Sequence, residues 1–275
     1  MKLGCNTIHP TERLKDSSRQ FGKEMQIKSL ELIAQAGFDA VEYSHIEHLN
    51  DDDLKIISAA MRDLGLLSWS AHSWQSIPGN ISGLEKALTE YDKFLHKSKL
   101  LGVKVIVVHC DGENNNLEDT NVKQKRLDAN LTCLEPLADK AAEINASVAI
   151  ENGTNWADWQ FIIEMVTNLQ HPSVGLNIDT GHANLGEMKP ARAIRAAGSL
   201  LITTHLQDNY GKVDDHLPPG LGTIDWFSVV SALAEVGYAG TYMVEISDCP
   251  PEREPQADKD IQTSYDNLAR FLGTK

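Results

Sequence analysis

Strand-like and helix-like segments alternate along this 275-residue chain, and this alternation restricts the choice of fold more than any other feature. A strand followed by a helix and another strand is typical of a parallel sheet with crossover helices. Eight such pairs predict an α/β fold, a closed (β/α)8 TIM barrel. We expect it to form a single domain over residues 1–275, because such barrels run to about 250 residues as one unit. The expected strands are 2–6, 39–44, 66–73, 104–110, 146–152, 174–182, 200–209 and 240–248.

Glycines mark the ends of several expected helices. Gly37, Gly65, Gly102 and Gly237 each come shortly before a strand or turn, where a glycine can end a helix in the left-handed conformation. An open doubly wound sheet is the alternative arrangement. Closing the sheet removes its exposed edges, however, and no GxGxxG or P-loop pattern follows the first strand. The expected helices are 26–36, 52–64, 83–101, 121–144, 159–168, 190–197, 226–236 and 258–271.

Four residues of metal-binding type stand where the last four expected strands stop. Glu151, Asp179, His205 and Glu245 each follow a short apolar run. In a barrel the carboxyl ends of all strands meet at one mouth, where the active sites of this fold lie. Three carboxylates and one imidazole suit one divalent ion, Mn²⁺, Mg²⁺, Co²⁺ or Zn²⁺, and an oxygen-rich set favours the harder ions. A single strand-end carboxylate is often only a cap, so the set of four carries this prediction.

The charge balance and the apolar runs restrict partners and location. The 25 Lys and Arg against 39 Asp and Glu give a net charge of -14, which disfavours nucleic acid as a partner. The N-terminus lacks the apolar stretch of a signal peptide, and no run approaches the roughly 18 apolar residues of a membrane span. We expect a cytoplasmic protein with no membrane partner. Its cysteines are expected to be reduced and mostly buried, because they show no paired spacing: Cys5, Cys110, Cys133 and Cys249.

A string of motifs then gives a resemblance over essentially the whole chain. The motifs are AIEN at 149–152, NIDTGH at 177–182, THLQDN at 204–209, HLPPGLGTIDW at 216–226 and MVEI at 243–246. Together they resemble the xylose isomerase-like barrel superfamily of sugar isomerases and epimerases, which includes the endonuclease IV family. The resemblance implies that Glu151, Asp179, His205 and Glu245 bind the catalytic metal. It also implies that His182 contacts substrate or a further metal.

Further histidines are expected at the same mouth. His72 and His109 end the third and fourth strands. In endonuclease IV enzymes the matching positions bind extra zinc, as do the matches to His182, Asp214 and His216, so the resemblance allows further metals at His72/His109 and at His182/Asp214/His216. In many sugar-active relatives similar histidines instead hydrogen-bond substrate hydroxyls. We therefore expect these four histidines to bind either substrate or additional metal.

The resemblance implies that Glu151 and Glu245 act as an acid/base pair on opposite sides of the metal. Proton transfer through a metal-stabilised enediolate is the expected reaction. This predicts a divalent-metal-dependent isomerase or epimerase of a small carbohydrate or its derivative. The alternative is a metal-dependent lyase or dehydratase acting on a keto-sugar or keto-glycoside. An endonuclease IV-like multi-zinc phosphodiesterase is a third reading, which the net charge disfavours.

The substrate is left open by two departures from the relatives. Free-ketose 3-epimerases carry an Arg a few residues after the metal-binding His, but here His205 is followed by LQDNYGK. Hydroxypyruvate isomerase-like members show Arg-His-Glu where this chain has Asp215, His216 and Leu217. Relatives often form dimers or tetramers, so a homo-oligomer is compatible with the resemblance.

Three more residues are candidates for substrate contact. Trp74 and Trp156 each follow a strand of the predicted site, where an indole can stack on the apolar face of a sugar. Glu42 ends the second strand and can contact substrate or cap a loop. Trp69 and His72 are an odd number of positions apart, so strict alternation places Trp69 between sheet and helices.

Overall fold

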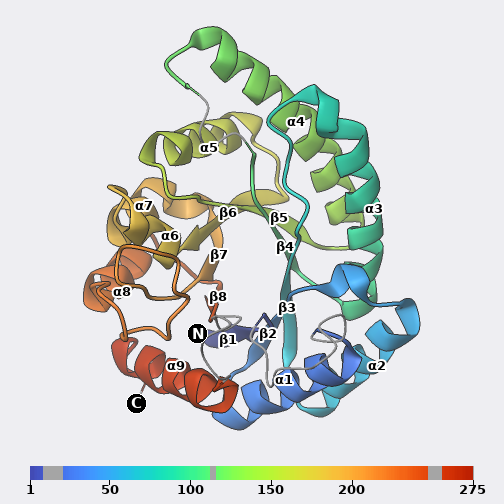
Figure 1. Cartoon of the computed structure of the whole chain (residues 1–275), viewed down its shortest axis with the longest axis vertical. Coiled ribbons are helices and arrows are strands. Elements are labelled where there is room, and N and C mark those ends of the chain that lie inside the picture. Colours follow the sequence, from blue (N-terminus) through green and yellow to red (C-terminus); the bar gives the residue numbers. More distant parts are fainter. Residues whose placement is uncertain (9–20, 112–115, 247–255, 275) are drawn as a thin grey trace.

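Eight parallel strands form the wall of a barrel in this computed structural model, which describes residues 1–8, 21–111, 116–246 and 256–274. The strands are neighbours in the order β7-β6-β5-β4-β3-β2-β1-β8, so β8 pairs with β1. Figure 1 shows the helices arranged outside this ring. The strands are β1 Lys2–Asn6, β2 Ala40–Tyr43, β3 Leu67–His72, β4 Val105–Val108, β5 Ser147–Glu151, β6 Val174–Asp179, β7 Leu201–His205 and β8 Thr241–Val244.

The ring is joined between β7 and β8, just beyond the end of β7. Leu206 forms a parallel bridge with Val244. The Leu206 N–H donates to the Met243 carbonyl at 2.8 Å, and the Glu245 N–H donates to the Leu206 carbonyl at 3.3 Å. These bonds join the two strands that would be edges in an open sheet. The predicted (β/α)8 barrel is therefore confirmed, and the open doubly wound alternative is wrong.

The helices follow the strands in the predicted order. The glycines expected at helix ends take the left-handed conformation, because Gly37, Gly65, Gly102 and Gly237 have φ angles of 101°, 74°, 73° and 70°. The described helices are α1 Lys23–Ala36, α2 Asp51–Asp63, α3 Leu84–Leu101, α4 Thr120–Glu143, α5 Trp156–Leu169, α6 Thr180–Leu185, α7 Pro190–Ala197, α8 Trp226–Glu235 and α9 Ala257–Phe271. Short 3-10 turns are η2 Ile46–His48, η3 Ile81–Gly83 and η4 Gly198–Leu200.

Helix α6 is the main difference from the expected elements. The sixth strand was predicted to run to residue 182, but β6 ends at Asp179 and a helical turn starts at once. The Asp179 carboxylate accepts the backbone N–H of His182 at 2.7 Å, which caps the new helix. The prediction was wrong here because Asp-Thr-Gly-His fits a strand end and a capped helix start equally well by composition.

Some predictions concern residues outside the described part of the chain. These are Cys249 and the end of the expected strand 240–248. Cys5 and Cys133 are buried free thiols and Cys110 is a half-buried one. Among the described helices, none combines the length and apolar character needed to cross a membrane.

Side chains alternate between the helical layer and the barrel interior. In β4, Ile106 and Val108 pack in the large cluster under the helices, whereas Val105 and Val107 form a separate apolar cluster with Ala149 of β5. Towards the carboxyl ends of the strands the inward positions become polar, as at Glu151 in β5. The apolar lower layer thus supports a polar upper layer at the mouth of the barrel.

A β-bulge in β3 reverses the expected position of Trp69. Val41 pairs with Ser68 and Glu42 pairs with Ser70, so Trp69 is an extra residue on β3. Its indole packs against the inner apolar cluster, and its Nε1–H donates to the Thr203 hydroxyl of β7 at 3.1 Å. The expectation that Trp69 lies between sheet and helices was wrong, because strict alternation holds only in a strand without a bulge.

Candidate active site

Glu151, Asp179, His205 and Glu245 come together at the carboxyl ends of β5 to β8. One ligand atom from each lies within 4.8 Å of the others. All four side chains are buried, with exposures between 0% and 5%. Three carboxylates buried around one imidazole are costly unless a positive charge offsets them. The arrangement therefore fits a bound cation better than it fits a purely structural cluster.

The orientation of His205 is consistent with a metal ligand. Its Nδ1 lies 3.0 Å from an oxygen of Glu151 and 3.0 Å from an oxygen of Glu245. Yet Nδ1 is buried and makes no hydrogen bond of acceptable angle within the described residues. Its Nε2 lies 3.0 Å from the Glu42 carboxylate on the opposite side of the ring. A nitrogen aimed at carboxylates without a satisfactory hydrogen bond is the expected geometry for a shared cation.

Asp179, at the end of β6, is held by hydrogen bonds to Asn152, which directly follows β5. Its backbone N–H donates to the Asn152 side-chain oxygen at 2.7 Å, and the Asn152 amide donates back to the Asp179 carbonyl at 3.1 Å. Asn152 follows Glu151 directly, so this pair ties two candidate ligands together. Glu151 is fixed in turn by the Asn177 amide, which donates to Oε2 at 3.0 Å.

Burial and neighbouring charges shift the pKa values in this cluster. Burial, together with the charge of Glu151 and against that of His182, raises the pKa of Asp179 to about 7. Burial lowers the pKa of His205, but Glu245, Glu42 and Glu151 outweigh it and raise that pKa well above its usual value. Without a cation, an imidazolium therefore supplies part of the missing positive charge.

A second group of histidines forms the outer side of the site. His182 Nδ1 lies 3.2 Å from Glu151 and its Nε2 lies 3.1 Å from Asp214. Asp214 also pairs with His216 at 3.0 Å. His72 and His109 approach Glu151 at 3.3 Å and 3.8 Å. The structure thus brings all the expected histidines to one place.

These groups surround a cavity of about 270 Å³ at the barrel mouth. Three trios that share residues with the four-residue cluster also meet the geometry of a metal site: His72/His109/Glu151, His72/His205/Glu245 and Asp179/His182/His216. The cavity is lined by Ile8, Ser44, His72, Ser73, Trp74, Ser76, His109, Glu151, His182, Asp214, His216 and Glu245.

The remaining candidates fall into different surroundings. Trp74 lines the cavity and is 57% exposed, so its indole is free to meet a ligand. Trp156 is the first residue of α5 and does not line the cavity. The Arg192 guanidinium carbon lies 3.6 Å from the centre of its ring. Glu42 is fully buried beneath His205 and also lies outside the lining.

Gln207 is a site residue that the sequence did not reveal. It is fully buried, and its amide donates to Asp214 at 2.7 Å and approaches both oxygens of Asp179 at 3.3 Å. It therefore connects a candidate metal ligand to the carboxylate that holds His182 and His216. Its place within the THLQDN motif was the available signal, but a glutamine after a strand has many structural roles.

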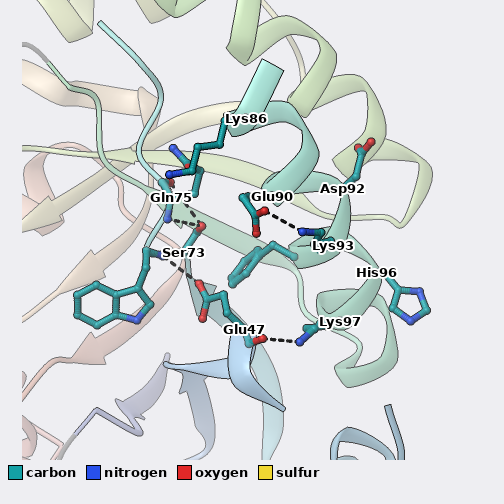
Figure 2. A pocket seen from close by; sticks show the side chains of 11 residues that line it. Glu47, Ser73, Gln75, Lys86, Glu90, Asp92, Lys93, His96 and Lys97 are labelled. Atoms are coloured by element: carbon teal, nitrogen blue, oxygen red, sulfur yellow. Dashed lines mark hydrogen bonds and ion pairs between the residues drawn. The ribbon is translucent and has the colours of Figure 1, made fainter. Parts of the chain in front are cut away.

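A larger cavity of about 680 Å³ lies outside the mouth, beside α3 (Figure 2). Two of its lysines already have hydrogen-bond partners: Lys93 donates to the Glu90 carboxylate at 2.8 Å, and Lys97 donates to the Glu47 backbone carbonyl at 2.6 Å. It shares Ser73 and Trp74 with the inner cavity but none of the four strand-end ligands. The smaller cavity is therefore the one lined by candidate metal-binding and acid/base residues.

Comparison with known proteins agrees with this architecture. Residues 30–267 match the family described as xylose isomerase-like TIM barrel. The chain belongs to this family. Among solved structures, this xylose isomerase-like barrel shares its fold with a D-tagatose 3-epimerase-like protein, with a TM-score of 0.75 and 24% identity over 100% of this chain and 98% of the other.

Curated relatives of this xylose isomerase-like protein include carbohydrate enzymes. It is 24% identical over 229 residues to the D-psicose 3-epimerase of Agrobacterium fabrum, covering 78% of this chain and 77% of the relative. It is 26% identical over 280 residues to the inosose dehydratase of Lacticaseibacillus casei, covering 90% and 91%. The homologues therefore include a sugar epimerase and a dehydratase of a cyclic keto-polyol.

Proposed function

We propose that this protein is a divalent-metal-dependent isomerase or epimerase acting on a small sugar or sugar derivative. The observation that carries the proposal is the approach of Glu151 and Glu245 to one atom, His205 Nδ1, at 3.0 Å each. Glu151 ends β5 and Glu245 directly follows β8, so the two carboxylates enter the centre from different parts of the barrel wall. The similarity to a D-psicose 3-epimerase supports the same class of reaction.

Glu151, Asp179, His205 and Glu245 would hold the cation, which would polarise a substrate carbonyl and acidify the neighbouring C–H group. Glu151 and Glu245 are then placed to move the proton. Removal by one carboxylate and return by the other to the opposite face inverts the carbon, which is epimerisation. Return of the proton to the adjacent carbon is aldose–ketose isomerisation.

The outer histidines would bind and orient the substrate. Burial lowers the pKa of His216, but its hydrogen bond to Asp214 and the charge of Glu245 raise it to about 9. In the metal-free protein His216 is therefore a hydrogen-bond donor, suited to a hydroxyl or carbonyl oxygen. The cavity of about 270 Å³ lies just below the roughly 300–1,000 Å³ of usual ligand pockets, which favours a substrate of monosaccharide size.

Dehydration of a keto-sugar or an inosose is the second candidate function. The ion pair between His182 and Asp214, 3.1 Å apart, favours it because an imidazolium at the cavity could donate a proton to a leaving hydroxyl. The inosose dehydratase that resembles this chain over 90% of its length supports the same possibility.

Exchange in deuterated solvent tests the proposal and separates the two reactions. Protein loaded in turn with Mn²⁺, Mg²⁺, Co²⁺ or Zn²⁺ is incubated with a panel of ketoses, keto-sugars and inososes, and the products are followed by NMR. An isomerase or epimerase incorporates deuterium beside the carbonyl and forms a new isomer, whereas a dehydratase forms an unsaturated product. E245Q should abolish both reactions with the fold retained.

The panel also includes an abasic oligonucleotide. Absence of exchange with every carbohydrate by protein that binds metal would overturn the proposal. Cleavage of the oligonucleotide by protein carrying two or three zinc ions would replace it with the phosphodiesterase function.

A further inference from the structure

We propose that Glu42 is a positioning residue that fixes the orientation and the protonated nitrogen of His205, so that Nδ1 is presented to the cation. This inference rests on the proposed metal-dependent function. It assigns Glu42 a role different from the substrate contact expected from its place at a strand end. No substrate contact is needed for this role.

Glu42 is held against the far side of the His205 ring. Its side chain is fully buried on β2, and both of its carboxylate oxygens lie 3.0 Å from His205 Nε2. The Ser70 hydroxyl donates to Oε2 at 2.6 Å. Within the described part of the chain, these two residues are its hydrogen-bond partners. Among the described residues, therefore, no lysine or arginine pairs with Glu42 to explain a carboxylate at this depth.

The chemistry of the two side chains determines which nitrogen carries the proton. An ionised carboxylate can only accept hydrogen bonds, so the His205 nitrogen facing Glu42 must be N–H. Nε2 is thus the donor, and Nδ1 can give its lone pair to a cation once its own proton is released. A carboxylate bonded to a ligating imidazole also fixes the ring plane and increases the basicity of the ligating nitrogen.

The bulge in β3 is part of this arrangement. Because Trp69 is the extra residue, Ser70 is the residue that pairs with Glu42 in the sheet register. The Ser70 hydroxyl then points to the Glu42 carboxylate. Ser70, Glu42 and His205 thus form a chain of hydrogen bonds that crosses from β3 through β2 to β7.

Three variants test the assignment, E42Q, E42A and S70A, with D39N as the matched control. Asp39 directly precedes β2, at the end of the strand opposite to the site, and its carboxylate accepts the Leu3 N–H at 2.9 Å. Metal affinity of the folded proteins is measured by calorimetric titration with Mn²⁺ and Zn²⁺. We expect E42A to lose about 10- to 100-fold in affinity. E42Q keeps an acceptor oxygen and should lose less, S70A less again, and D39N nothing.

NMR of the histidine side chains gives a readout that does not depend on metal or activity. Wild-type and D39N proteins should show a slowly exchanging His205 Nε2–H proton, both metal-free and loaded with Zn²⁺. This signal should be absent in E42A and shifted in E42Q. Wild-type metal affinity in folded E42A and E42Q, with the Nε2–H signal unchanged, would overturn the inference while leaving the proposed function intact. Failure of the wild-type protein to bind any divalent ion would overturn both.

Discussion

The Asp179 carboxylate accepts the His182 backbone N–H at 2.7 Å, so the residue that ends β6 also begins α6. One side chain thus serves as a helix cap and as a candidate metal ligand. The two tasks make different demands on its chemistry, because a cap needs an acceptor oxygen whereas a cation needs a charge. Substitutions at this position can therefore separate them.

We expect D179N to lose most of the metal affinity and to keep the fold, because an asparagine oxygen can still cap the helix. D179A should lose both and be less stable than D179N by about 1 kcal/mol. Calorimetric metal titration and urea denaturation measure the two effects. Metal binding by D179N equal to that of the wild type would remove Asp179 from the ligand set.

Metal affinity should fall as the pH is lowered through the pKa of Asp179, about 7. The raised pKa means that the proton stabilises this buried group in the metal-free fold, and that stabilisation is lost as pH rises. A cation replaces the proton, so binding is tighter at high pH and releases protons. Titrations at about pH 6 and about pH 8 in buffers of different ionisation enthalpy check this. Affinity independent of pH over this interval would contradict it.

The Gln207 side chain packs directly against Gly181. A Cβ at position 181 would overlap the Gln207 amide, so only glycine leaves room for it. G181A should displace Gln207 from Asp179 and Asp214, with a loss of about 1–3 kcal/mol in stability and a marked loss of activity. A double-mutant cycle provides the check. In a Q207A background the added methyl group has room, so the stability cost of G181A should largely disappear. A cost that persists there would show that the overlap is not with Gln207.

W69F removes the hydrogen bond from the indole to Thr203, which connects β3 to β7 through the barrel interior. We expect a loss of about 0.5–1.5 kcal/mol in the free energy of unfolding. W69A should cost more than W69F, because it also empties part of the inner apolar layer. Urea denaturation of both variants gives these values. A negligible effect of W69A would place the indole outside the core.

Trp74, unlike Trp69, is 57% exposed and lines the cavity, so we expect it to matter for substrate binding and not for stability. W74A should leave the unfolding midpoint close to that of the wild type and raise KM for the substrate found in the panel, with a smaller effect on kcat. Steady-state kinetics and thermal unfolding measured on the same preparation test this. A fall in kcat at unchanged KM would show that Trp74 does not act through substrate binding.

The sequence by itself determined the barrel and the position of its candidate metal ligands. The alternation of apolar runs with capped helices sets the order of elements, and parallel strands place their carboxyl ends on one face. Glu151, Asp179, His205 and Glu245 could therefore be predicted to lie together from the sequence alone. Their common position depends only on where each strand stops, which is a local property of the chain.

Only the tertiary structure decided which side chains contact and orient these candidate ligands. The contacts of Glu42 with His205 and of Gln207 with Asp214 depend on strand register and on the direction of each ring and amide. The bulge at Trp69 shows the physical reason, because one extra residue exchanges the inner and outer faces of a strand and leaves no mark in the hydrophobic pattern. The candidate ligands could be predicted from the sequence, but the contacts that surround them are set by packing across the barrel.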